Sequence, residues 1–274
     1  MASTTGLYNP AFEHDACGIG FVANIKGNKN HQTIADALTI LENMEHRGAC
    51  GCEANTGDGA GIMLQIPHEF FFDECLKQGV PLPRFQRYGV GMIFFPREIR
   101  LREECREIFL RAAEKLRLEG LCWRKVPVDT TDIGATALSV EPEIEQVFIA
   151  CPDHITNPDE FERKLFVLRN YASHIIFNTV REDEIGFYIA SLSYKTIVYK
   201  GQLTSNQVRR YFSDLTNKRV VSAFGLVHSR FATNTFPSWK LAQPFRYIAH
   251  NGEINTLQGN LNWLKTSEPG FETP

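Results

Sequence analysis

The apolar residues of this 274-residue chain switch repeatedly between two spacings, and this switching restricts the fold more than any other feature. Alternating runs predict β-strands, whereas a repeat of three to four residues predicts helices with one buried face. Strands are predicted at 21–25, 62–66, 90–95, 147–151, 187–192, 197–199 and 220–227, and helices at 34–44, 99–118 and 159–177. Because the two kinds of segment do not alternate as regular βαβ units, they favour an α+β layered architecture over a doubly wound parallel sheet.

Composition and charge exclude several classes of protein. Apolar residues make up 43% and charged residues 22% of the chain, which is typical of a globular protein. A formal net charge of −3 gives no reason to expect nucleic acid or an anionic membrane as a partner. No stretch reaches the 18 or so apolar residues that a membrane-spanning helix needs.

The first sixteen residues do not read as a targeting signal. Acidic residues stand at 13 and 15, where a secretory signal would have an apolar core and small residues. By length alone, residues 1–16 read as a disordered terminus or a short propeptide. The seven cysteines are an odd number without a regular framework, so we predict reduced thiols and a cytoplasmic protein.

Two glycine-containing motifs invite functional readings that their context does not favour. The spacing of Cys50-Gly51-Cys52 is a poor match to zinc sites, so we predict small buried hydrophobic residues and no metal. The run from Thr56 to Gly61 looks like a phosphate-binding loop, but it leads into a predicted strand and not into a helix. A tight turn is therefore predicted there.

Cys17 is the first candidate for chemistry. If the bond between Ala16 and Cys17 is cut, the residue gains a free α-amino group beside its thiol. Such an amine titrates near about 7.7–8.0, so close to neutral pH much of it is able to take the thiol proton. One cleaved bond would thus supply a nucleophile and a base in one residue.

Two later motifs are weak when taken alone. His228 and Arg230 follow a strand-like segment two residues apart, and an arginine there would suit a carboxylate ligand or a structural ion pair. The loop from Asn234 to Pro244 has residues that would fold over a ligand. The Asn251-Gly252 pair would supply two converging donors for an oxyanion, or simply a hairpin turn.

Taken together in order, these motifs resemble the class II glutamine amidotransferases, and within them the N-terminal domain of the glutamate synthase large subunit. The resemblance rests on four runs: Cys17-Gly-Ile-Gly-Phe21, Met44-Glu-His-Arg-Gly-Ala49, His228-Ser-Arg-Phe-Ala-Thr-Asn-Thr235 and Gln243 to Asn255. It implies the four-layer αββα sandwich of the N-terminal-nucleophile hydrolases. It also implies a removed propeptide at 1–16 followed by an amidotransferase domain at 17–274 that continues beyond Pro274.

The resemblance further assigns roles to individual residues. Cys17 would attack the side-chain amide of L-glutamine and form a γ-glutamyl thioester, with its own amine as base. The remaining roles are the oxyanion hole for Asn251 and Gly252, substrate binding for Arg230, His228 and Thr233, and support for His46, Arg47 and Gly48. In the full-length enzyme the ammonia would pass to 2-oxoglutarate, and other domains would carry FMN and an iron–sulfur cluster.

Two other readings stay open at this point. The family's segment that binds the substrate α-amino group is missing from this sequence, so the chain is alternatively a non-catalytic module that acts as a binding or regulatory partner. A papain-like hydrolase using His228 or His250 is the other alternative. Cys17 lacks the helix N-terminal setting that lowers the thiol pKa in such enzymes.

Overall fold

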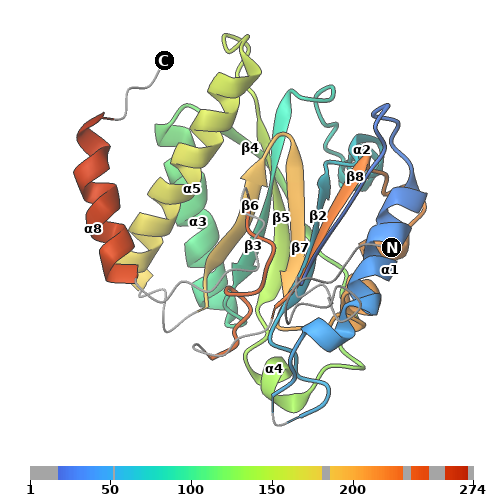
Figure 1. The fold of residues 1–274 in the computed structure, drawn as a ribbon. Helices are drawn as coiled ribbons and strands as arrows, with labels where there is room; N and C mark the ends of the chain where they lie inside the picture. Colours follow the sequence, from blue (N-terminus) through green and yellow to red (C-terminus); the bar gives the residue numbers. More distant parts are fainter. Residues whose placement is uncertain (1–17, 52, 181–185, 231–235, 247–256, 271–274) are drawn as a thin grey trace, which may run out of the picture.

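The computed structural model describes residues 18–51, 53–180, 186–230, 236–246 and 257–270 (Figure 1). The strands are β1 (Ile19–Ala23), β2 (Ala60–Gln65), β3 (Tyr88–Phe95), β4 (Glu119–Lys125), β5 (Glu143–Ala150), β6 (Tyr188–Ser193), β7 (Thr196–Gly201) and β8 (Phe224–Ser229). The helices are α1 (His31–Asn43), α2 (His68–Leu76), α3 (Ile99–Lys115), α4 (Ala135–Ser139), α5 (Pro158–Val180), α7 (Gln207–Tyr211) and α8 (Leu257–Ser267).

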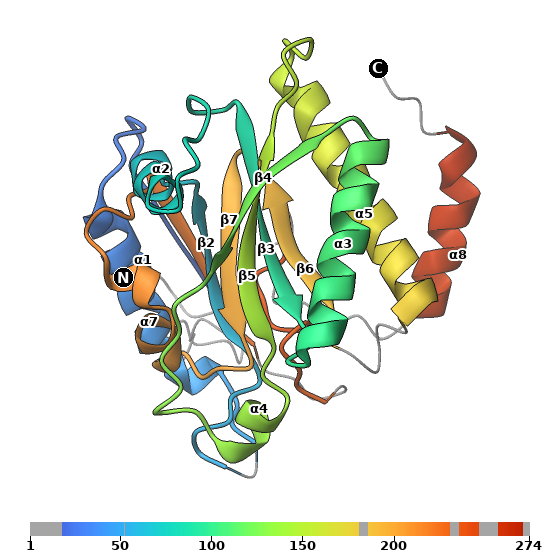
Figure 2. The ribbon, with the colours of Figure 1, turned by 180° about the vertical axis from the view of Figure 1, so that it is seen from behind.

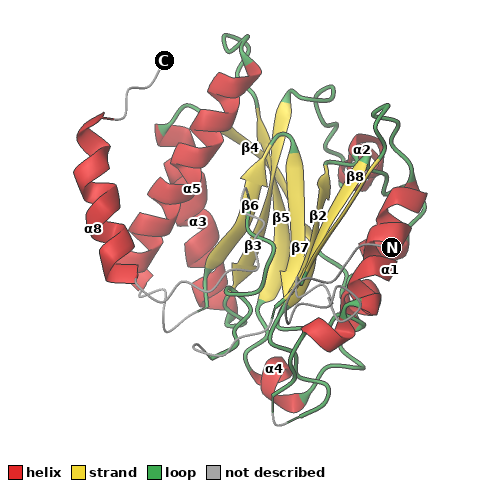
Figure 3. Cartoon of the chain, viewed as in Figure 1, coloured by secondary structure: helices red, strands yellow, loops and turns green. Residues whose placement is uncertain are grey.

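The eight strands form two antiparallel sheets, in the orders β1-β8-β2-β7 and β4-β5-β3-β6. Helix α1 covers the outer face of the first sheet, and α3 and α5 cover the outer face of the second, as Figures 1 and 2 show from opposite sides. The secondary-structure colouring of Figure 3 makes the succession of helix, sheet, sheet and helix layers visible. The predicted α+β sandwich is confirmed.

Alternation along β3 explains why the second sheet lies between two apolar cores. Val90, Met92 and Phe94 belong to the core shared with the first sheet and α1. Ile93 and Phe95 point the other way and pack with α3 and α5. A strand buried on both faces produces this continuous apolar run.

Helix α1 begins at a side-chain cap and packs closely on the first sheet. The Asn30 side chain accepts a hydrogen bond from the backbone N–H of Thr33 at 2.8 Å, which satisfies a donor that the first helical turn leaves open. On the sheet, a Cβ at Gly225 would lie 2.6 Å from the Cβ of Ala37. The bare backbone of Gly225 therefore lets the helix approach β8. From the sequence the helix was expected to end at Gly48, but α1 ends at Asn43, and a separate 3-10 turn at Glu45–Arg47 leads to Gly48.

A buried polar network joins the two sheets. Arg124 on β4 makes two hydrogen bonds of 2.8 Å to the carboxylate of Asp214, and it also bonds to Gln146 on β5. The Tyr199 hydroxyl on β7 lies between Gln146 Nε2 at 3.1 Å and Asp214 at 2.9 Å. The buried charges of Arg124 and Asp214 are thus paired, and the polar groups around them are hydrogen-bonded.

Two details of the sequence predictions are corrected. The strand predicted at 220–227 is β8, which begins only at Phe224 and extends to Ser229. As predicted, β8 is central, with β1 on one side and β2 on the other. Cys50 is exposed and not buried, while the five described cysteines are all free, and Cys52 lies outside the described residues.

No helix in the described ranges combines the length and the apolar character needed to cross a membrane.

Candidate active site

The start of β1 and the end of β8 bring two of the sequence motifs together. Ile19 pairs with His228, and the backbone N–H of Ser229 donates to the carbonyl of Gly18 at 2.7 Å. Segments more than two hundred residues apart in sequence therefore meet at one end of the first sheet. Cys17, which precedes Gly18, lies outside the described residues.

Arg230 follows β8 directly and is held by the turn before β2. Its backbone N–H donates to the carbonyl of Gly59 at 2.8 Å, and its guanidinium donates to the carbonyl of Asp58 at 3.1 Å. Burial lowers the pKa of Arg230, and the carboxylate of Asp58 opposes that shift. The half-buried guanidinium, with part of its donor fork held by a backbone oxygen, is suited to bind an anion.

The predicted turn before β2 is confirmed and supplies those carbonyls. Gly59 has φ of +130°, a conformation that side-chain-bearing residues rarely adopt, and β2 starts at the next residue. The Asp58 backbone N–H donates to Ala49, which fixes the turn against the chain that follows α1. This arrangement explains the glycine-rich run without a phosphate ligand.

His228 lies in a row of paired residues that crosses the sheet. Gly61 is the register partner of both His228 and Lys200, so these two side chains extend from the same face with a glycine between them. Both are buried, with 2% of His228 and none of Lys200 exposed. A Cβ at Gly61 would lie 2.7 Å from the carbonyl oxygen of Gln243, so the segment 236–246 covers this row.

The predicted supporting motif reaches the end of β8 through Gly48. A Cβ at Gly48 would lie 2.7 Å from Ser229 Oγ, which accepts a hydrogen bond from Ser205 Oγ at 2.9 Å. His46 is exposed, and its ring lies 3.1 Å from the carbonyl of Asn43. Arg47 Nε is buried, and among the described residues it has no hydrogen-bond partner.

The segment 236–246 has its own anchors on the sandwich. Trp239 is 4% exposed, donates from Nε1 to the carbonyl of Ala137 at 3.0 Å, and lies against Gly201. Arg246 donates to the carbonyls of Ile189 and Ala190 on β6. Phe236, near the start of this segment, is 94% exposed.

Several residues named from the sequence lie outside the described residues: Cys17, Thr233, His250, Asn251 and Gly252. Their predicted roles stay predictions. What the structure brings together is Gly18, His228, Arg230 and Gly48. The sequence analysis missed two residues, Asp58 and Lys200. Asp58 acts through its backbone carbonyl, and Lys200 is a buried lysine on a strand; no sequence pattern predicts either feature.

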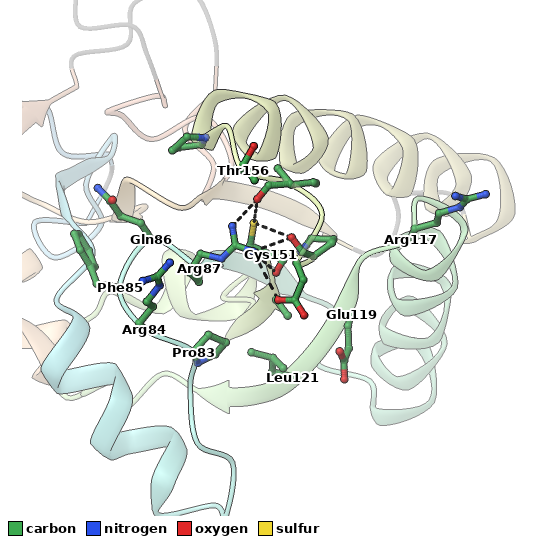
Figure 4. A pocket seen from close by; sticks show the side chains of 15 residues that line it. Pro83, Arg84, Phe85, Gln86, Arg87, Arg117, Glu119, Leu121, Cys151 and Thr156 are labelled. Atoms are coloured by element: carbon green, nitrogen blue, oxygen red, sulfur yellow. Dashed lines mark hydrogen bonds and ion pairs between the residues drawn. The ribbon is translucent and has the colours of Figure 1, made fainter.

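A cavity of about 1060 Å³ lies elsewhere, between the start of β3 and the segment after β5 (Figure 4). Arg87 has a structural role there, because its guanidinium donates to the carbonyls of Ile155 at 2.6 Å and Pro152 at 2.8 Å. Arg84 and Arg117 lie on opposite sides of the opening in Figure 4. The charged groups do not converge on one point, so this cavity is not the candidate site.

Within the described ranges, no three His, Cys, Asp or Glu side chains gather as a metal site would require.

The layered fold, and the meeting of Gly18 with the strand end before Arg230, are consistent with a class II amidotransferase of the N-terminal-nucleophile fold, and comparison with known proteins shows the family. The family model of the class II glutamine amidotransferases matches residues 17–274. The chain belongs to this family.

Its relatives are glutamate synthases. The chain is 46% identical over 274 residues to the large chain of NADPH glutamate synthase from Bacillus subtilis, covering 99% of this chain and 17% of that protein. It is 49% identical to NADH glutamate synthase of Schizosaccharomyces pombe, covering 98% and 13%. Ferredoxin-dependent glutamate synthase 2 of Synechocystis is 42% identical, covering 95% and 16%. The chain therefore spans about a sixth or less of the length of these relatives.

Proposed function

We propose that this chain is the glutamine-hydrolysing part of a glutamate synthase and that Cys17 is its nucleophile. One observation carries the proposal: the family match begins at residue 17, and the neighbouring Gly18 is hydrogen-bonded to the strand end that leads to Arg230. A removed leader at 1–16 agrees with that starting point. The domain then comprises 17–274 and whatever follows it in the whole protein.

The chemistry proceeds in two halves. The thiol proton of Cys17 passes to its own α-amino nitrogen, and the sulfur attacks the side-chain carbonyl carbon of glutamine. The Asn251 amide and the Gly252 N–H stabilise the resulting oxyanion. The amine then returns the proton to the leaving nitrogen, ammonia departs, and a γ-glutamyl thioester remains. Water hydrolyses this thioester to glutamate and restores the thiol.

Substrate binding falls to residues at the end of β8 and after it. Arg230 holds the α-carboxylate of glutamine with its guanidinium, to which the carbonyl of Asp58 is also hydrogen-bonded. His228 and Thr233 complete the binding site, and His46, Arg47 and Gly48 support it from the end of α1. In the whole enzyme the ammonia goes to 2-oxoglutarate, and the FMN and iron–sulfur cluster belong to that enzyme; no step described for this chain uses them.

The test is to combine mass spectrometry with chemical labelling. Purified protein is expected to begin at Cys17, and the glutamine analogue 6-diazo-5-oxo-L-norleucine should label that residue once per chain. Replacing Cys17 by Ala should abolish labelling, while replacing the exposed Cys50 by Ala should leave it intact. A purified chain that keeps residues 1–16 and resists the analogue would support a non-catalytic binding module instead.

A further inference from the structure

A buried lysine lies next to the site. Lys200 on β7 has no exposed surface, and the described residues include no carboxylate paired with its Nζ. Desolvation lowers its pKa, and the nearby charges of Arg246 and Arg230 lower it further. A buried ammonium is costly unless its donors are satisfied, so its actual partners need an explanation.

Those partners are backbone oxygens and aromatic rings of the covering segment. Nζ donates to the carbonyl of Ala242 at 2.7 Å and to that of Lys240 at 2.9 Å. It also lies 4.3 Å from the centre of the Phe245 ring and 4.8 Å from that of Tyr188. One charge thus binds three residues of the segment 236–246, in an environment where such contacts are strong.

Arg246 anchors the same segment in the opposite direction. Its guanidinium donates to the carbonyls of Ile189 at 3.2 Å and Ala190 at 3.3 Å, and to the Tyr188 hydroxyl. The pairing of β3 with β6 shifts register at this point, so that Ala190 has no partner on β3. Such a bulge disrupts the ladder locally and leaves backbone groups for other partners. Lys200 on β7 and Arg246 in the segment therefore anchor the segment 236–246 to β7 and β6 in opposite directions.

The anchored segment in turn contacts the turn that holds Arg230. A Cβ at Gly59 would lie 2.9 Å from both Cα and Cβ of Ala242, so these residues are packed face to face. Gly59 accepts the Arg230 backbone N–H, and Asp58 accepts its guanidinium. A continuous path of contacts runs from Lys200 through Ala242 and Gly59 to Arg230.

We propose that Lys200 is a positioning residue for substrate binding: it fixes the segment 236–246, and through Ala242 and Gly59 it sets the place of the Arg230 guanidinium. This inference rests on the proposed function, because it assumes that Arg230 binds the glutamine α-carboxylate. It assigns Lys200 no part in proton transfer. The residue acts on substrate affinity and not on the chemical step.

The first arm of the test measures labelling of the full chain by 6-diazo-5-oxo-L-norleucine as a function of concentration. Lys200→Met should raise the half-saturating concentration about tenfold, the loss expected for one charge-assisted hydrogen bond, and leave the limiting rate within about twofold. Lys195→Met is the matched control, because Lys195 lies in the connection between β6 and β7, is exposed and is paired with Asp159. Lys200→Gln, which keeps a donor, should recover part of the affinity. Unchanged half-saturation in a folded Lys200→Met protein would overturn the inference while leaving the role of Cys17 in place.

The second arm does not depend on Cys17. In a Trp123→Phe, Trp263→Phe background, Trp239 reports on the segment alone, since the chain has three tryptophans. Lys200→Met should increase acrylamide quenching of Trp239 at least about twofold, and Lys195→Met should not. If quenching is the same in both variants, the anchoring role is refuted, even where the wild-type chain is not labelled by the analogue. If Lys200→Met does not fold, Lys200→Gln replaces it in the labelling and quenching experiments, and the same outcomes support or refute the inference.

Discussion

At the scale of single residues, the charged side chains of the site donate hydrogen bonds to backbone carbonyl oxygens. Arg230 donates to the backbone carbonyl of Asp58, which is a neutral oxygen. A guanidinium presents several donors in a fixed plane, whereas an ammonium is a compact point charge. The geometry of the fork should therefore matter as much as the charge.

Replacing Arg230 by Lys tests this point. We expect the half-saturating concentration of the glutamine analogue to rise about tenfold or more, since one or more charged hydrogen bonds to the carboxylate are lost while the charge stays. The limiting labelling rate should change much less. Arg219→Lys, at an exposed ion pair with Asp73, is the control. Equal affinity of the Arg230→Lys variant and the wild type would refute the carboxylate role.

At the scale of elements, local signals determine where helix α1 begins. The sequence predicted α1 because Ile34, Ala37, Leu38 and Leu41 recur on one face, and all four are buried. The cap at Asn30 sets the first turn. The cap is a local interaction, so its contribution is separable from that of the core.

Asn30→Ala should lower the free energy of unfolding by about 0.5–2 kcal/mol, because the N–H of Thr33 loses its acceptor. Chemical denaturation measures this change. The matched control is Asn28→Ala in the preceding turn, where an exposed side chain is removed and about 0.5 kcal/mol or less is expected. Equal losses in the two variants would show that the cap does not stabilise α1.

The same scale shows why part of the fold was not predictable. Strand β8 starts four residues later than predicted, because Ser222 turns the chain: its hydroxyl accepts from the backbone N–H of Gln65 and donates to the carbonyl of Phe224. Helix α2 was missed because Phe70, Phe71 and Phe72 are consecutive and hide the helical repeat. Strand β4 was missed because its buried position Arg124 is charged. For β8 and β4 the deciding partners are distant in sequence: Gln65 for Ser222 and Asp214 for Arg124.

For the site, the sequence indicated His228, Arg230 and the motif ending at Gly48, and these lie at one end of the first sheet. It did not indicate Lys200, because the predicted strand 197–199 ended one residue earlier and a lysine normally lies at the surface. The contacts that bury it come from a segment 40 residues later. Such a site is apparent only in three dimensions.

At the scale of the whole molecule, the two sheets are joined by apolar packing and by the network around Arg124. Its ion pair with Asp214 is almost inaccessible to solvent, with 6% and 3% of the two side chains exposed. Removing one partner leaves the other charge buried and unpaired, which costs far more than the pair itself contributes.

Asp214→Ala should therefore lower the free energy of unfolding by about 3–5 kcal/mol. The matched control is Asp132→Ala, which breaks an exposed ion pair with Arg210 and should cost about 1 kcal/mol or less. Urea denaturation followed by circular dichroism compares the two. Similar costs would mean that the network around Arg124 is not what holds the sheets together.

The pairing of β1 with β8 has a consequence for biosynthesis. The partner of the first strand is the last strand of its sheet, about two hundred residues downstream. At a translation rate of about 5–20 residues per second, β1 waits on the order of 10–40 s before β8 has been made. Any trimming of the leader that needs the completed sheet can therefore begin only after the chain has been synthesised as far as Ser229.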